Sequence, residues 1–113
     1  MDFTVIAHAV EVDHGIKRLS MRFIKKYAAP ERQRLSAELC DEISKELDKL
    51  GLITLPRRLP TSENEFVFVI EKDSALGQTV TVASTLAALD KLGQSPLPRL
   101  FDNYTEARGQ LIS

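Results

Sequence analysis

Apolar side chains in the middle of the chain recur every three or four residues, with polar residues between them. They are Leu35, Leu39, Ile43, Leu47 and Leu50. This spacing predicts an amphipathic helix over residues 30–50 that buries one stripe of side chains. Pro30 suits the first turn of such a helix, and Gly51 suits the left-handed position that ends it.

A β-hairpin is predicted directly after this helix. Two runs rich in β-branched, aromatic and other apolar residues, 52–55 and 66–70, are typical of strands. Pro56 and Pro60 lack the N–H that a strand ladder requires, so they indicate a loop between the two runs. The second run is apolar on both faces, with Phe66, Phe68 and Ile70 on one and Val67 and Val69 on the other. We therefore expect a central strand, or a strand that a partner covers.

Two segments near the N-terminus carry different patterns. Residues 16–27 have apolar side chains at helical spacing and a basic outer face, which predicts an amphipathic helix. Over residues 3–12, alternation predicts a buried strand, whereas steps of four and three predict a helix. The β-branched Thr4, Val5 and Ile6 favour the strand. We therefore expect a strand there, with the helix as the alternative.

A further helix is predicted after the hairpin. Asp73 or Ser74 can cap its start, and Gly93 is placed to end it. Its apolar surface is wide, and its small residues would allow close packing against another helix. Residues 79–82 would also fit a strand. The Pro-containing residues 96–113 then predict an extended tail with a short last helix at 104–111.

These elements predict the α+β fold class: a helix-rich single domain over residues 1–95, containing a β-hairpin and an added N-terminal strand. The length of 113 residues, with 43% hydrophobic and 27% charged residues, suits one soluble globular domain. The single cysteine excludes an internal disulfide and fits a cytoplasmic location. We expect no membrane association, because no apolar run approaches the ~20 residues of a membrane helix. The N-terminus lacks the features of a secretory signal.

The net charge is −1, but the charges are unevenly placed. Residues 17–34 hold seven basic residues and one acidic residue, whereas residues 38–48 hold five acidic residues and one basic residue. Two solvated helix faces explain this asymmetry most simply. A binding patch is the alternative interpretation.

Residues 41–71 resemble the recognition helix and wing of winged-helix domains. In multiple-antibiotic-resistance-type repressors a similar Leu-x-x-Leu-Gly-Leu-Ile, here residues 47–53, ends the recognition helix, and a wing with basic residues follows. The resemblance implies a winged-helix DNA-binding transcriptional regulator. The residues that it would place on DNA are Ser44, Lys45 and Lys49 on the helix and Arg57 and Arg58 in the wing.

Three features differ from that pattern. Residues 31–50 show no break that would separate a supporting helix from a recognition helix. The helix surface is acidic and would repel phosphate. The whole chain is also slightly acidic rather than basic. We therefore place DNA binding second and disfavour nucleic acid as the partner.

No catalytic or metal-binding pattern is present in the sequence. His8 and His14 are the only histidines, and no CxxC or HExxH motif completes a ligand set. Cys40 lies beside the apolar stripe, which predicts a buried thiol rather than a nucleophile. The glycines form no phosphate-binding loop. We expect no cofactor and no enzyme activity, and an enzyme using His8, His14 or Cys40 ranks third.

The function that we expect first is a non-enzymatic protein–protein interaction module, a small adaptor or regulatory component that binds a protein partner or forms a homodimer. Three features motivate this hypothesis: a strand that is apolar on both faces, a helix rich in small apolar residues, and an apolar tail. The residues expected to contact the partner are Arg57, Arg58, Leu59 and Thr61 in the hairpin loop and Leu97, Arg99, Leu100 and Phe101 in the tail.

Overall fold

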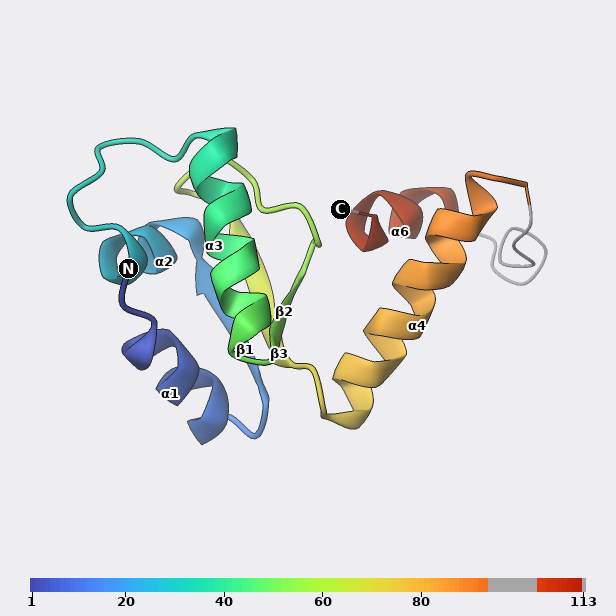
Figure 1. Ribbon diagram of the computed structural model, residues 1–113, viewed down its shortest axis with the longest axis horizontal. Coiled ribbons are helices and arrows are strands. Elements are labelled where there is room, and N and C mark those ends of the chain that lie inside the picture. Colours follow the sequence, from blue (N-terminus) through green and yellow to red (C-terminus); the bar gives the residue numbers. More distant parts are fainter. Residues whose placement is uncertain (94–103, 113) are drawn as a thin grey trace.

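A computed structural model describes residues 1–93 and 104–112 of the chain (Figure 1). The fold is α+β, as the sequence predicted. Its elements are α1 (Thr4–Val12), β1 (Ile16–Ser20), α2 (Met21–Ala28), α3 (Ala37–Lys49), β2 (Leu52–Leu55), β3 (Phe66–Glu71), α4 (Ala75–Asp90) and α6 (Tyr104–Leu111). No helix among the described residues combines the length and the apolarity that crossing a membrane requires.

The three strands form one antiparallel sheet in the order β1-β3-β2. The strand β3 is therefore central, which confirms one of the two outcomes expected for an apolar run on both faces. In the register, Phe68 of β3 lies between Arg18 of β1 and Leu55 of β2. The hairpin of β2 and β3 follows α3 directly, and Gly51 makes the turn with a φ of 76°.

The main core lies between the helices α1, α2 and α3 and one face of the sheet. Val67 and Val69 of β3 point into it and are fully buried, together with Ile24 of α2 and Ile43 of α3. On the opposite face, α4 covers only one end of the sheet. There Val80 packs with Ile53 and Ile70 in a cluster that is separate from the main core. One face is thus fully covered and the other only in part.

The predicted strand over residues 3–12 is wrong, because α1 occupies Thr4–Val12. Phe3, Ile6 and Val10 are buried in the core, and their spacing of three and four residues puts them on one side of a helix. Packing of these three side chains outweighs the strand propensity of the β-branched residues around them.

The single helix predicted over residues 16–27 is also wrong in its first part. Residues Ile16–Ser20 form β1, which pairs with β3 along its whole length. The hydroxyl of Ser20 then accepts a hydrogen bond of 3.1 Å from the N–H of Phe23 and caps α2. Helical spacing within α2 is retained, since Met21, Ile24 and Ala28 are buried.

The helix predicted from residue 30 begins only at Ala37. The hydroxyl of Ser36 accepts a hydrogen bond of 3.0 Å from the N–H of Leu39, which caps the helix at that point. Residues 29–36 form a loop, so Pro30 does not lie in a first helical turn. The break between α2 and α3 is therefore longer than the two residues that the predicted helices left between them.

The helix α4 extends away from the body of the domain, and α6 lies against its far end (Figure 1). Ser74 caps α4 as predicted, since its hydroxyl accepts a hydrogen bond of 2.9 Å from the N–H of Gly77. At the far end, Ala87 packs against Leu111 and Ile112 of the C-terminal segment.

Candidate interaction surfaces

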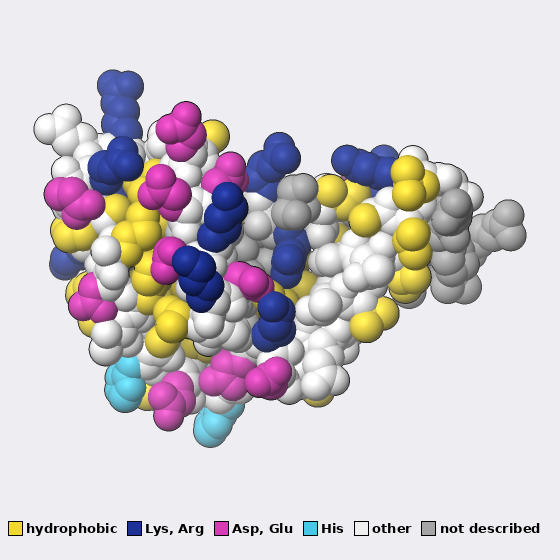
Figure 2. Space-filling view, in the orientation of Figure 1, with side chains coloured by type: hydrophobic (Ala, Val, Ile, Leu, Met, Phe, Trp, Pro, Cys, Tyr) yellow, Lys and Arg dark blue, Asp and Glu magenta, His cyan; other side chains and the backbone are white. Residues whose placement is uncertain are grey.

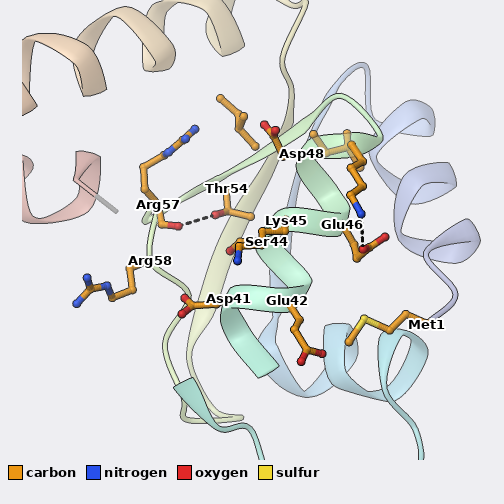
Figure 3. Close-up of a pocket in the computed structure, with 13 residues that line it drawn as sticks. Met1, Asp41, Glu42, Ser44, Lys45, Glu46, Asp48, Thr54, Arg57 and Arg58 are labelled. Carbon is orange, nitrogen blue, oxygen red and sulfur yellow. Dashed lines mark hydrogen bonds and ion pairs between the residues drawn. The ribbon is translucent and has the colours of Figure 1, made fainter. Parts of the chain in front are cut away.

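An open concavity of about 750 Å³ runs along the exposed side of α3. Arg57 and Arg58 approach it from the hairpin side, and Ser44 and Lys45 line it from α3 (Figure 3). Lys49 lines it as well. The structure therefore brings together all five residues that the winged-helix resemblance implied for DNA contact.

The position of these residues follows from local structure. The turn at Gly51 sends β2 back beside α3, with which it packs. The side chain of Thr54 lies between the two elements, and its hydroxyl donates hydrogen bonds of 3.0 Å and 3.4 Å to the carbonyls of Pro56 and Arg57. These bonds hold the start of the hairpin loop next to α3.

The electrostatic character of the concavity is mixed. Four carboxylates line it beside the four cationic side chains: Asp41, Glu42, Glu46 and Asp48. Lys49 pairs with Glu46 at 3.0 Å, and Lys72 pairs with Asp48 at 2.7 Å. Figure 2 shows Lys or Arg and Asp or Glu side chains interspersed over this side of the molecule. The surface thus lacks the single sign of charge that a phosphate backbone attracts.

The hairpin loop is folded against the helical body. Leu59 is only 4% exposed and belongs to the main core, so it does not lie on the surface at which a partner contact is expected. The thiol of Cys40 donates a hydrogen bond of 3.4 Å to the carbonyl of Pro60, and the N–H of Met21 donates one of 2.8 Å to the carbonyl of Glu65. No local pattern indicates this docking, because Leu59 lies in a loop bounded by Pro56 and Pro60.

The other predicted loop residues remain on the surface. Arg58 and Thr61 are exposed, and Arg57 is half-buried. The N–H of Arg57 donates a hydrogen bond of 2.8 Å to the carbonyl of Gln110, which ties the loop to α6. The predicted tail contacts, Leu97, Arg99, Leu100 and Phe101, lie outside the described residues.

A second surface lies on the sheet face that α4 leaves partly open. Phe66 is 49% exposed and Phe68 is 39% exposed, although both belong to the central strand. The guanidinium of Arg18 on the neighbouring strand lies 4.0 Å from the ring centroid of Phe66. The sequence offered the relevant signal, an apolar pattern on both faces of this strand, but did not show which of them stayed open.

The outward side of α4 forms a third apolar surface. Among the described residues, the large apolar side chains exposed on α4 and just after it are Leu76, Val82, Leu89 and Leu92. In Figure 2, hydrophobic side chains follow the outer edge of this helix. The sequence had indicated a wide apolar surface here, without showing that the rest of the described chain leaves so much of it uncovered.

The residues considered for catalysis or metal binding are not gathered at these surfaces. His8 and His14 are exposed on and just after α1, and Cys40 is buried at the base of α3. Burial raises the pKa of the Cys40 thiol, and the nearby charge of Asp41 adds to this effect. Among the described residues, no group of three or more His, Cys, Asp or Glu side chains is placed to hold a metal ion.

Comparisons of this chain with protein-family models, with curated proteins and with solved structures found no significant match.

Proposed function

We propose that this chain is a non-enzymatic protein–protein interaction module, which serves as a small adaptor or regulatory component. One observation carries the proposal: Phe66 and Phe68 stand side by side on the outer face of the central strand and remain 49% and 39% exposed. Adjacent exposed aromatic residues are uncommon on a surface that only meets water, and aromatic residues are enriched in protein interfaces.

The surroundings of the two phenylalanines also suit a protein partner. Arg18 covers part of the Phe66 ring, and arginine and aromatic side chains are the residue types that most often dominate the energy of an interface. Ile16 and Leu55 are half-buried and face the same side of the sheet. A partner that covers this face would bury an apolar centre with a cationic rim.

The concavity along α3 supports the same proposal from its charge. Its carboxylates and cationic side chains are interspersed, so it could form ion pairs with both signs of charge on a protein surface. Asp41, Glu42, Arg57 and Arg58 all line the concavity, and no ion pair between described residues engages any of these four.

Photo-crosslinking in living cells tests the proposal. A benzoylphenylalanine in place of Phe68 keeps an aromatic group on the sheet face and reacts with whatever lies against it. The control places the same residue at Val12 on α1, which is 60% exposed and lies on another side of the domain. We expect a discrete protein adduct from position 68 that is absent from position 12. Equal labelling from the two positions would reject this surface as an interface.

A winged-helix DNA-binding regulator is the second candidate, and two observations favour it. The loop at residues 29–36 separates α2 from α3, so these helices and the following hairpin have the order of a helix-turn-helix unit with a wing. The basic residues Lys45, Arg57 and Arg58 also share one concavity. The four carboxylates in that concavity keep this candidate second.

Duplex binding measured over a range of salt concentrations tests the second candidate. DNA binding through this surface predicts an affinity that falls steeply with salt, and a salt slope that decreases by about 2 when Arg57 and Arg58 are both replaced by alanine. The matched control replaces Arg18 and Arg22, which do not line the concavity. A chain that fails to bind a mixed-sequence duplex even at low salt is not a DNA-binding regulator of this kind.

A further inference from the structure

The helix α4 is almost free of charge along its whole length. No ionisable residue occurs from Ser74 to Leu89, and the one carboxylate of the helix, Asp90, pairs with Arg108 at 3.0 Å. Helices on the surface of a soluble domain usually carry charged residues on their outward side. A helix that is hydrophobic all round is normally buried.

The described part of the chain buries only one side of α4. Val80 packs against the sheet and Ala87 against the C-terminal segment; both are buried, and they lie seven positions apart on the same side of the helix. Val82 and Leu89, also seven positions apart, lie on the opposite side and are 59% and 36% exposed. Leu92, just after the helix, is 71% exposed. The exposed side of α4 thus combines these apolar side chains with uncharged polar residues such as Thr81 and Thr85, and it carries no charged side chain.

We propose that the outward side of α4 binds a second copy of this chain, with the two α4 helices antiparallel about a two-fold axis. This inference rests on the proposed interaction function and names one partner for it. A two-fold axis between Thr85 and Leu86 places Val82 of each copy against Leu89 of the other. The pairing is self-complementary at these two positions, because a valine meets a leucine in each half of the interface.

Charge favours a second copy as the occupant. Two identical surfaces repel each other when they carry net charge, and this surface carries none. The antiparallel arrangement also aligns the positive end of each helix dipole with the negative end of the other. In addition, α4 begins beside the sheet and extends away from it, so antiparallel pairing puts the two domain bodies at opposite ends (Figure 1).

The area available on α4 agrees with a weak dimer. A helix of this length is about 24 Å long and about 10–12 Å wide, so one side spans roughly 250 Å² in projection. An interface of this size lies at or below the ~1,000 Å² lower bound of specific interfaces, which is the range of weak or transient association. We therefore expect a dissociation constant in the micromolar range.

Sedimentation equilibrium of the full chain over about 1–200 µM tests the association. We expect the mass to rise from the chain mass of 12.6 kDa toward twice that value. Val82→Glu should raise the dissociation constant at least about 100-fold, because symmetry buries two uncompensated carboxylates. Val12→Glu is the matched control, with the same substitution at a valine that is 60% exposed on α1, and should dimerise like the wild type. A wild type that remains monomeric throughout, or equal effects of the two variants, would overturn the inference.

Cysteine crosslinking tests the orientation in a background that carries Cys40→Ala. Position 85 lies next to the proposed axis. A Thr85→Cys variant should therefore form a disulfide between position 85 of one chain and position 85 of the second chain. A cysteine at Val82 should not do so, but should pair with a cysteine at Leu89 when the two variants are mixed. Self-crosslinking at Val82 and at Leu89 would indicate parallel helices and would reject the antiparallel pairing.

Failure of this inference differs from failure of the proposed function. If the chain is monomeric but still gives a discrete adduct from position 68, the α4 dimer is rejected and the proposed interaction function stands. If the chain dimerises but gives no specific adduct from position 68, the pairing through α4 stands and the sheet face is rejected as an interface.

Discussion

The guanidinium of Arg18 lies over the ring of Phe66 at 4.0 Å from the ring centroid, across the boundary between β1 and β3. Neither side chain is buried, so the contact covers part of an aromatic face that the rest of the described chain leaves open. A cation–π contact at an exposed position contributes about 0.5–1 kcal/mol. Its modest size suggests that the arrangement matters more for what the surface can bind than for stability.

Replacement of both Phe66 and Phe68 by serine should leave the fold intact. Both side chains are partly exposed, so their loss opens no closed cavity in the main core, which lies on the other face of the sheet. We expect the free energy of unfolding to fall by no more than about 2 kcal/mol, as measured by urea denaturation. With benzoylphenylalanine at position 68, Phe66→Ser alone should reduce the yield of the photo-crosslinked adduct, because the neighbouring ring of the same surface is lost.

A control for this variant is Val67→Ser on the same strand. Val67 is fully buried in the main core, so the serine leaves a cavity and a buried hydroxyl. We expect a loss of about 3 kcal/mol or more. If the exposed double variant proved as unstable as Val67→Ser, the two phenylalanines would have a structural role rather than an interface role.

Loss of the Ser36 hydroxyl should destabilise the domain at the start of α3. This hydroxyl accepts the N–H of Leu39 at 3.0 Å and satisfies one of the free donors at the helix end. Ser36→Ala should lower the free energy of unfolding by about 1 kcal/mol in a urea titration. Ser62→Ala is the control, since that exposed hydroxyl has only a 3.4 Å contact with the N–H of Asn64, and it should change the stability by less than half as much.

Sequence patterns located the elements that local residues determine. The end of α3 at Gly51, the two hairpin strands and the cap of α4 at Ser74 all follow from side chains within a few residues of each feature. The strand β1 could not be found in this way. It exists because Ile16–Ser20 pair with Phe66–Ile70 about 50 residues later, and helical spacing continues through it by coincidence.

The candidate surfaces show the same limit. Arg57 and Arg58 were identified from a basic loop, and their position in the concavity required only the hairpin to be correct. Leu59 is expected on the surface as part of the same hairpin loop, yet it is buried in the main core. The exposure of Phe66 and Phe68 depends on how much of the sheet α4 covers. No local pattern in the strand records that extent.

The stability of the domain should decrease at high pH through Cys40. Burial raises the pKa of this thiol above its ordinary value of 9.0, so the folded state holds the proton more tightly than the unfolded state. Its contribution to stability is complete below the unfolded pKa and is lost as the pH rises through the folded pKa. Urea titrations from pH 8 upward should show this fall, and Cys40→Ala should reduce it. A slope that is unchanged in Cys40→Ala would assign the pH dependence to other groups.

The attachment of α4 should depend on Gly77 more than on any charged contact. A Cβ at this position would lie 2.0 Å from the carbonyl oxygen of Glu71 and 2.8 Å from that of Lys72. These are backbone atoms at the end of β3, so they cannot move aside without displacing α4 from the sheet. Gly77→Ala should therefore cost at least about 2–3 kcal/mol, although alanine favours a helix more than glycine does.

Gly109→Ala in α6 provides the matched control for this effect. A Cβ there meets nothing within 4 Å, so the alanine gains helix propensity without a clash and should stabilise α6 by up to about 1 kcal/mol. Hydrogen exchange of the backbone amides of α4 measures both variants. We expect faster exchange along α4 in Gly77→Ala and unchanged or slower exchange in Gly109→Ala. Equal protection of α4 in the two variants would show that the close approach at Gly77 does not hold the helix against the sheet.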